Sequence, residues 1–245
     1  MEEMYFEKKY VLRTSDFDFK DKIRISAILD LTQSIAGLHA DMLGVSYEEL
    51  KAKDMFWVIS GLRFTLKRNP KADEEITVKT WPLKPVGVRF IRDCVFTDKD
   101  GNDIILVETT WIVITIDRKI VRPANVRFNS TNYFDKSLYN DNMPKICFDE
   151  KKKYNYNSHI VRNSDLDHNG HMNNAKYGDL ILDIFAPTAN IKSFVINFNH
   201  EALCGEEIKT YYYMDERENG IYYFEGVNED RKFYTAMLEM EIKDE

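Results

Sequence analysis

The sequence has little cysteine and no long hydrophobic run. Its 245 residues include three cysteines, Cys94, Cys147 and Cys204, which cannot all pair and lack the spacing of a metal site. We therefore expect a reduced protein of the cytoplasm. The longest apolar runs, such as residues 111–114, are too short to cross a bilayer, and residues 1–10 contain no apolar signal core. Neither a membrane partner nor secretion by a signal peptide is expected.

An excess of basic residues is also missing. The chain has 34 Lys and Arg against 41 Asp and Glu, a formal net charge of −7, which argues against a nucleic-acid partner. Hydrophobic residues make up 44% of the chain and charged residues 31%, a balance typical of a folded globular protein. The length alone leaves one large domain or two small ones open.

A weak internal repeat favours two domains. The residues Ser-Asp-Phe-Asp at 15–18 return as Ser-Asp-Leu-Asp at 164–167, and a β-leaning stretch precedes each copy, at 9–14 and 158–163. An apolar stripe with helical spacing follows each copy. The first stripe consists of Ile28, Leu31, Ile35, Leu38 and Met42, and the second of Tyr177, Leu180, Ile181, Ile184 and Phe185.

Strand patterns follow each predicted helix. Residues 62–67 alternate between apolar and polar side chains, as a half-buried strand does, and residues 194–199 are their counterpart. Further strands are expected at 74–78, 88–97 and 105–116 in the first half, and at 206–210, 210–214, 221–227 and 233–242 in the second. Because the connections are short, the strands should be antiparallel.

These patterns predict an α+β protein in which one helix packs on one antiparallel sheet, twice. Residues 1–136 form the first predicted domain, residues 137–153 a linker, and residues 154–245 the second domain.

The segment 164–177 has the strongest chemical signal. It places a carboxylate, an amide and an imidazole at alternate positions, Asp167, Asn169 and His171, directly before the second apolar stripe. Alternate residues of an extended or looping backbone can converge on one side, and Gly170 permits a tight bend between them. Backbone N–H groups at the start of the following helix could bind developing negative charge.

Three other interpretations of this segment are open. Residues 165–170 copy the opening of an EF-hand calcium loop, but Lys176 stands where that loop needs a bidentate Glu. His168 and His171 have a spacing that suits a metal on a helix, although Gly170 and the Asn-rich context disfavour a helix there. Finally, the Asp and Asn side chains could simply shape a turn and cap the helix.

The two copies of the repeat differ at the chemical positions. When Ser15 is aligned with Ser164, Asp18 matches Asp167, but two lysines, at 20 and 22, stand opposite Asn169 and His171. The simplest interpretation is one working copy and one copy retained for architecture.

The motif Asp167-x-Asn169-x-His171-x-Asn173-Asn174-x-x-Tyr177 resembles the signature of the acyl-ACP thioesterases, the plant and bacterial enzymes that end fatty-acid synthesis. The first half resembles the same family at residues 39–44, 57–58, 70–82 and 117–123, so the likeness extends from about Tyr5 to Ile242. Members of this family have two tandem hotdog domains, each an antiparallel sheet wrapped around a central helix, which agrees with the repeat.

The resemblance implies an active site in the second domain and a catalytically degenerate first domain. The catalytic residues would be Asp167, Asn169, His171 and Glu201. Glu201 would act as general base on water, with direct attack by its carboxylate on the thioester as the alternative. The oxyanion donors would be the backbone N–H groups of Met172, Asn173 and Asn174. Plant members carry Cys directly after this Glu, whereas this chain has Ala202, which excludes a cysteine nucleophile there. Cys204 is expected to be an ordinary buried thiol.

The resemblance also implies a substrate and a partner. The enzyme would hydrolyse fatty acyl-ACP to free fatty acid and holo-ACP without metal or other cofactor, as a monomer or homodimer. The acyl chain would lie in the first domain, with candidate wall residues Trp57, Ile59, Leu62, Phe64, Trp81 and Trp111. Candidate basic residues for docking the acidic carrier protein are Lys67, Arg68, Lys84, Arg89, Arg92, Arg118, Lys119, Arg122 and Lys151–Lys153. An acyl-CoA thioesterase and a non-catalytic acyl-binding module are the alternatives.

Overall fold

The structure is a computed structural model that describes residues 5–129, 133–153, 155–184, 190–229 and 231–241. The chain divides into two compact units, the first made of Met1–Thr14 and Asp30–Met143, the second of Ser15–Leu29 and Pro144–Glu245. The boundary between Met143 and Pro144 falls inside the predicted linker at 137–153. The domain limits and the roles given to each domain stay predictions.

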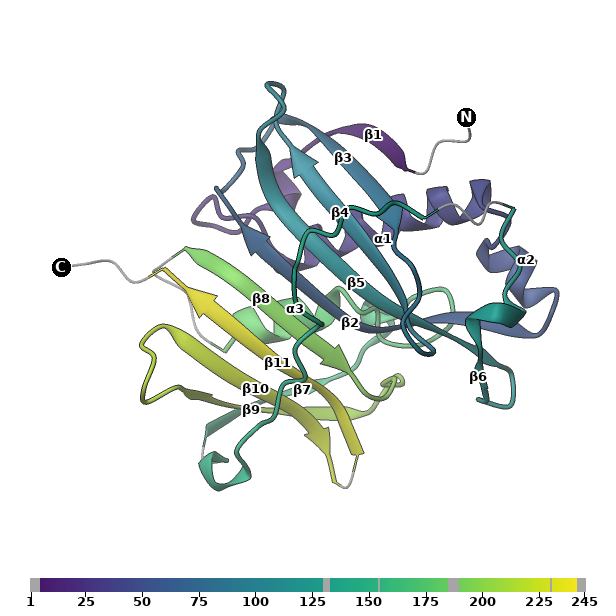
Figure 1. Cartoon of the computed structure of the whole chain (residues 1–245). Coiled ribbons are helices and arrows are strands. Elements are labelled where there is room, and N and C mark those ends of the chain that lie inside the picture. The colour runs from purple at the N-terminus through teal and green to yellow at the C-terminus, as the bar shows by residue number, and fades with distance from the viewer. Residues whose placement is uncertain (1–4, 130–132, 154, 185–189, 230, 242–245) are drawn as a thin grey trace. The chain divides into compact units, whose positions relative to one another are not determined.

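The first unit contains one antiparallel sheet, which Figure 1 shows as strands lying side by side. Its spatial order is β1 (Phe6–Val11), β3 (Glu75–Pro82), β4 (Phe90–Thr97), β5 (Asp103–Thr115) and β2 (Met55–Leu66), with the short β6 (Ile120–Val121) paired to β5. Each predicted strand of the first half overlaps one of these strands. The antiparallel order confirms the argument from short connections.

The strands of the second unit are also antiparallel. Their spatial order is β8 (Ile191–Phe198), β11 (Arg231–Met240), β10 (Ile221–Asn228), β9 (Glu207–Met214) and β7 (Asn155–Ile160). The two strands predicted at 206–210 and 210–214 are in fact one strand, β9, because pairing with β10 continues without a break from Lys209 through Met214.

The described residues contain three α-helices: α1 (Ile25–Met42), α2 (Tyr47–Lys51) and α3 (Lys176–Leu182). Short 3₁₀ turns occur at η1 (Thr14–Asp16), η2 (Pro123–Asn125), η3 (Glu150–Lys152) and η4 (Asn163–Asp165). The second predicted stripe lies on and just after α3, except for Phe185, which is outside the described residues.

The buried face of α1 differs from the predicted stripe. Met42 is 56% exposed, whereas two polar residues, Thr32 and His39, are each 1% exposed. The Arg92 guanidinium donates a hydrogen bond to Nδ1 of His39 at 3.0 Å, so the buried imidazole has a partner. Burial and the charge of Arg92 together lower the pKa of His39 to about 4. Hydrophobic spacing missed His39 on this face because a hydrogen bond, rather than apolar contacts, compensates the burial of its imidazole.

The first part of the predicted linker packs on the sheet of the first unit. Tyr139 donates a hydrogen bond to the carbonyl of Leu106 at 3.1 Å, and the guanidinium carbon of Arg63 lies 3.9 Å from the centre of its ring. The N–H of Leu138 donates to Oδ2 of the buried Asp93 at 2.8 Å. Residues 137–143 therefore form a fixed covering over buried charged groups.

Candidate active site

A tight loop around Asp167 holds the predicted site residues. Its carboxylate Oδ1 accepts hydrogen bonds from the backbone N–H groups of Asn169, at 2.8 Å, and His171, at 3.2 Å. The N–H of Asp167 donates to the carbonyl of His171 at 2.7 Å, and Gly170 adopts the left-handed conformation with φ of +78°. Asp167 thus fixes the backbone on which the amide and the imidazole stand, as an Asx turn does.

The corresponding loop of the first copy folds in the same way. Oδ1 of Asp18 accepts hydrogen bonds from the N–H groups of Lys20, at 2.8 Å, and Lys22, at 3.0 Å, and the N–H of Asp18 donates to the carbonyl of Lys22 at 2.8 Å. These bonds confirm the alignment of the two copies. The turn interpretation therefore accounts for the carboxylate in both loops, but not for Asn169 and His171.

A downstream segment brings Glu201 to this loop. The N–H of Met172 donates to the carbonyl of Ala202 at 2.8 Å, and His171 pairs with Leu203 in an isolated antiparallel bridge. Residues opposite one another in such a pair share a face, and so do alternate residues of each segment. This pairing brings the segment that contains Glu201, two residues before Leu203, alongside His171.

Two residues that the sequence analysis missed hold this segment in place. One guanidinium nitrogen of Arg231, Nη2, donates to both carboxylate oxygens of Glu206, at 2.8 and 2.7 Å, and to the carbonyl of Glu201 at 3.3 Å. The Glu206 carboxylate also accepts the N–H of Leu203 at 2.8 Å. No local spacing signals a pair 25 residues apart, because it forms only when β11 is placed beside the segment.

The predicted oxyanion donors need correction. The N–H of Met172 is donated to Ala202, and that of Asn173 to the carbonyl of Asp165 at 2.8 Å. Both groups are thus already used by the fold, which the sequence could not show. Within the described residues the N–H of Asn174 has no such bond, so it alone stays a candidate.

The site is open to water. Asn169 is exposed and His171 and Glu201 are half-buried, whereas Ala202 is fully buried. Cys204, expected to be buried, is exposed, and its Sγ lies 3.2 Å from Oδ1 of Asn163. The expectation failed because Cys204 lies in the turn before β9 rather than in a strand.

The six predicted acyl-chain residues separate into three groups within the first unit. Ile59, Leu62 and Phe64 are buried along β2. Trp57 and Trp111 are half-buried and pack against a core cluster consisting of Leu43, Val45, Leu50, Phe90, Val113 and Val126. Trp81 is buried elsewhere, with its indole N–H donated to the carbonyl of Lys136 at 2.8 Å. Trp57 and Trp111 thus pack against the same apolar cluster.

Other kinds of site find little support in the described residues. A pocket in the first unit, lined by residues of β4, β5 and 137–143, contains Arg89 of the predicted docking residues but none of the predicted catalytic or acyl-chain residues. Across the described ranges no three His, Cys, Asp or Glu side chains are grouped as metal ligands. No described helix combines the length and apolar character needed to cross a membrane.

Comparison with known proteins gives the same family for both units. Residues 3–130 match the acyl-ACP thioesterase N-terminal domain, and residues 148–236 match the C-terminal domain of that family. A chloroplastic acyl-(acyl-carrier-protein) hydrolase of Cuphea viscosissima is 25% identical over 221 residues, 83% of this chain and 53% of the relative. The palmitoyl-acyl carrier protein thioesterase of Arabidopsis thaliana is 24% identical over 226 residues, again 83% and 53%. The chain thus spans about half the length of these curated relatives.

Solved structures confirm the predicted tandem hotdog fold. An acyl-ACP thioesterase from Bacteroides thetaiotaomicron superposes with a TM-score of 0.87 at 23% identity, covering 97% of this chain and 98% of that one. The 12:0-ACP thioesterase from Umbellularia californica superposes with a TM-score of 0.80 at 16% identity, covering 98% of both chains.

Proposed function

Because the chain belongs to the acyl-ACP thioesterase family, we propose that it hydrolyses the thioester of a fatty acyl-ACP to a free fatty acid and holo-ACP. The observation that carries this proposal is the pairing of two segments of the second unit. His171–Met172 lies along Ala202–Leu203, so the segment that contains Glu201 runs beside a water-accessible loop that carries an imidazole. Thioester hydrolysis needs a base for water and a second polar group to orient it.

In the proposed reaction, Glu201 takes a proton from a water molecule whose oxygen attacks the thioester carbonyl. His171 and Asn169 orient the water and the carbonyl by hydrogen bonds, and the N–H of Asn174 donates to the oxyanion. The C–S bond then breaks, the carrier thiol leaves with a proton, and the new carboxylic acid keeps the oxygen from water. Asp167 acts on this chemistry through the backbone, since its carboxylate accepts the N–H groups of Asn169 and His171.

The acyl chain is proposed to bind in the first unit, at the cluster that includes Trp57 and Trp111. Both indoles already donate their N–H groups, Trp57 to the carbonyl of Val45 at 2.8 Å and Trp111 to Oγ1 of Thr109 at 2.9 Å. Their exposed surface is therefore apolar, which suits a hydrocarbon chain.

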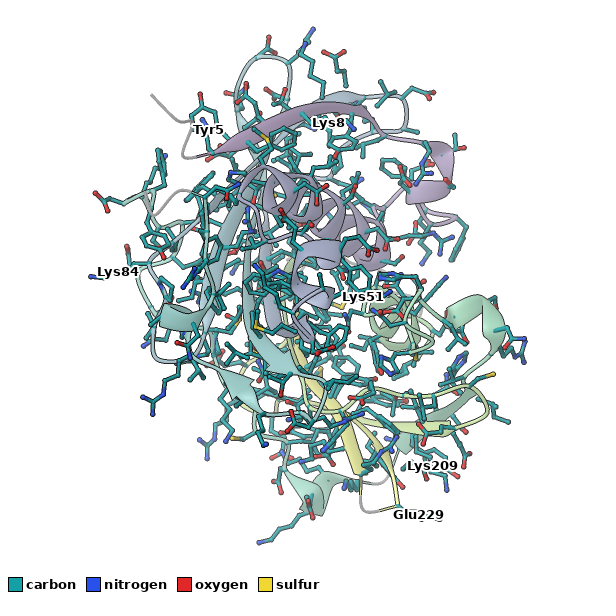
Figure 2. All side chains as sticks on the ribbon, turned by 90° about the vertical axis from the view of Figure 1, so that its right-hand side faces the viewer. Tyr5, Lys8, Lys51, Lys84, Lys209 and Glu229 are labelled. Atoms are coloured by element: carbon teal, nitrogen blue, oxygen red, sulfur yellow. The ribbon has the colours of Figure 1, made fainter. Side chains whose placement is uncertain are left out.

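Docking of the acidic carrier protein is proposed to depend on a smaller basic set than the sequence predicts. Arg92 is 9% exposed and therefore unsuited to contact a partner. Lys153 forms an ion pair with the buried Glu225, and Arg68 with Glu74. Lys84, by contrast, extends outward in Figure 2 and is exposed. The oligomeric state stays open, and the location in the cytoplasm stays a prediction from the cysteine content.

The test is incubation of the purified protein with acyl-ACPs of several chain lengths and measurement of the released fatty acid. Wild type should release acid, and Glu201→Gln should lose about 10²–10⁴-fold in rate while remaining folded. If both Glu201→Gln and His171→Ala keep near-normal rates, the catalytic roles proposed for Glu201 and His171 are wrong. The same acyl chain on coenzyme A distinguishes the acyl-CoA alternative, and binding without cleavage would indicate an acyl-binding module.

A further inference from the structure

Tyr177, in the first turn of α3, has a buried hydroxyl without a hydrogen bond. The residue is 1% exposed, and its oxygen has no hydrogen-bond partner in the described part of the chain. Buried hydroxyls are nearly always paired, because an unsatisfied polar group loses its water without compensation. Phenylalanine would fill the same space without a buried polar group, so the presence of the Tyr177 hydroxyl requires an explanation.

The ring of Tyr177 is held so that its hydroxyl has a fixed position. Phe198 of β8 meets it edge-on, with ring centres 5.7 Å apart and planes at 70°. Tyr234 of β11 meets it in the same manner at 5.2 Å and 72°. The Tyr234 hydroxyl, unlike that of Tyr177, shares a hydrogen bond with Oγ1 of Thr210 at 2.8 Å. Helix α3 and strand β11 thus place two buried tyrosines in contact, one with a hydrogen-bonded hydroxyl and one without.

The Tyr177 hydroxyl faces the segment that contains Glu201. It lies beside the backbone of Ala202, although not in the geometry of a hydrogen bond. Burial raises the pKa of Tyr177 above its usual range, and the negative charges of Glu201 and Glu206 raise that pKa further, against the opposing effects of the Ala202 backbone and of Arg231. The hydroxyl therefore keeps its proton, and it lies beside a segment that carries a carboxylate.

We propose that Tyr177 is a positioning residue, whose hydroxyl donates a hydrogen bond to the carboxylate of Glu201 during acyl-ACP hydrolysis. This inference rests on the proposed function, in which Glu201 is the base. Tyr177 keeps its proton throughout, while Glu201 takes the proton of the attacking water with its other lone pairs. The hydrogen bond fixes the direction of the carboxylate and favours its ionised form, so that the base is ready at neutral pH.

The experiment compares Tyr177→Phe with Tyr234→Phe, two substitutions that each remove one buried hydroxyl from touching rings. Rates of fatty-acid release are measured from about pH 5 to 9, together with the melting temperature of each variant. For Tyr177→Phe we expect kcat to fall about 10- to 100-fold with KM unchanged, and the acid limb of the pH profile to move up by about one pH unit. Tyr234→Phe should lower the melting temperature, because Thr210 loses its partner, but leave the acid limb in place.

The outcomes separate this inference from the proposed function. If Tyr177→Phe keeps the wild-type kcat and the wild-type acid limb of the pH profile, the role proposed for Tyr177 is wrong. It is also wrong if Tyr234→Phe shifts the acid limb as far as Tyr177→Phe does. These results leave the proposed function intact if Glu201→Gln is inactive. Full activity of Glu201→Gln, on the other hand, would remove the base itself, and with it the role proposed for Tyr177.

Discussion

The loops that begin the two halves of the chain have one backbone and two different sets of side chains. Residues 15–24 and 164–173 each begin in a 3₁₀ turn and reverse around an aspartate whose carboxylate accepts two backbone N–H groups. Each loop then closes with an isolated antiparallel bridge, at Phe17 and Ile23 in the first and at Leu166 and Met172 in the second.

The difference lies at two positions that the backbone does not specify. Lys20 and Lys22 occupy, in the first loop, the places of Asn169 and His171 in the second, and the same backbone hydrogen bonds form in both. An amide and an imidazole are therefore unnecessary for this turn. Their presence in the second loop requires another reason, and chemistry at the paired segment 201–203 supplies one.

The most direct way to break this comparison is to give the second loop the side chains of the first. The double variant Asn169→Lys/His171→Lys should lose at least about 10²–10⁴-fold in fatty-acid release, because the groups that orient water and carbonyl are gone. Its far-ultraviolet circular dichroism and cooperative unfolding should stay close to wild type, because lysines already stand on this backbone in the first loop.

The reverse exchange is the matched control. Lys20→Asn/Lys22→His in the first loop should leave activity unchanged and keep the turn, since the backbone bonds to Asp18 do not involve the lysine side chains; its stability cost is the loss of the hydrogen bond that Nζ of Lys22 donates to Oδ1 of Asn190 and of the contact between Lys20 and the Phe19 ring. Normal activity of the double lysine variant, or equal losses from both exchanges, would contradict a division into one working loop and one structural loop.

The two halves also differ in how they balance buried carboxylates. In the second unit, Glu225 is fully buried and forms ion pairs with Lys153, at 2.7 Å, and Lys232. In the first unit, Asp93 and Glu108 face one another across β4 and β5, and one buried guanidinium, that of Arg63, lies at Glu108. Burial raises the pKa of Asp93 to about 7, opposed by the N–H of Leu138.

This imbalance predicts a pH-dependent stability that Asp93→Asn removes. Since the pKa of Asp93 rises from 3.8 to about 7 on folding, the folded state binds the extra proton between these values. The free energy of unfolding should therefore fall as pH rises from about 4 to 7, by at most about 4 kcal/mol from this group. Asn keeps an oxygen for the N–H of Leu138, so Asp93→Asn should be the more stable protein at pH 8.

Urea unfolding of both proteins at pH 5, 6, 7 and 8 measures this effect. Glu108 and Tyr139 interact electrostatically with Asp93, so the substitution also changes their titration, and the slope of the difference reports Asp93 together with these neighbours. A difference in unfolding free energy that stays constant across this range would mean that Asp93 is ionised throughout.

The aspartates of the two loops provide a smaller and more specific test. Asp18→Ala and Asp167→Ala each remove the acceptor of two backbone N–H groups, so each should cost about 1 kcal/mol in unfolding free energy. Only Asp167→Ala should also lower the rate of fatty-acid release, because it releases Asn169 and His171 from their backbone positions.

Asp167→Asn separates the backbone role of Asp167 from a chemical one. Asn retains an oxygen acceptor for the two N–H groups but has no negative charge. If Asp167 only shapes the loop, this variant should keep activity within a few-fold of wild type. A loss as large as that of Asp167→Ala would show that the charge itself takes part in the reaction.

The sequence was sufficient for the fold because the same pattern occurs twice. The alternation of apolar and polar residues in 62–67 and 194–199, together with the short connections, predicted antiparallel sheets. The first segment overlaps β2 and the second overlaps β8. The predictions failed where polar groups replaced apolar ones in the interior. His39 and Arg92 satisfy one another inside the first unit, so neither the buried face of α1 nor the burial of Arg92 follows from hydrophobicity.

For the candidate site, local spacing identified the loop but not the groups that surround it. Asp167, Asn169 and His171 lie within five residues, so the turn that joins them is visible in the sequence. The pairing of Met172 with Ala202 uses a predicted oxyanion donor, and it depends on two segments 30 residues apart. Arg231 and the hydroxyl of Tyr177 likewise acquire their roles only after the sheet brings their surroundings together.

The smallest effect is expected at the tip of the two loops, where Gly170 and Asp21 both have positive φ, +78° and +57°. A Cβ at position 170 would meet no atom within 4 Å, so Gly170→Ala should cost only the backbone strain, about 1 kcal/mol. Asp21→Gly should relieve similar backbone strain, offset by the greater freedom of Gly in the unfolded chain and by the loss of the aspartate side chain. Thermal unfolding measures both changes.

Activity then decides why the second loop has glycine at its tip. If Gly170 serves only the turn, Gly170→Ala should hydrolyse acyl-ACP at nearly the wild-type rate, because Asp21 shows that a side chain is compatible with this backbone. If the rate falls more than about 10-fold while unfolding changes as expected, the open space around position 170 is needed by the substrate. The tip of the loop would then belong to the active site together with Asn169 and His171. The first loop, which has aspartate at its tip, would then lack three active-site residues instead of two.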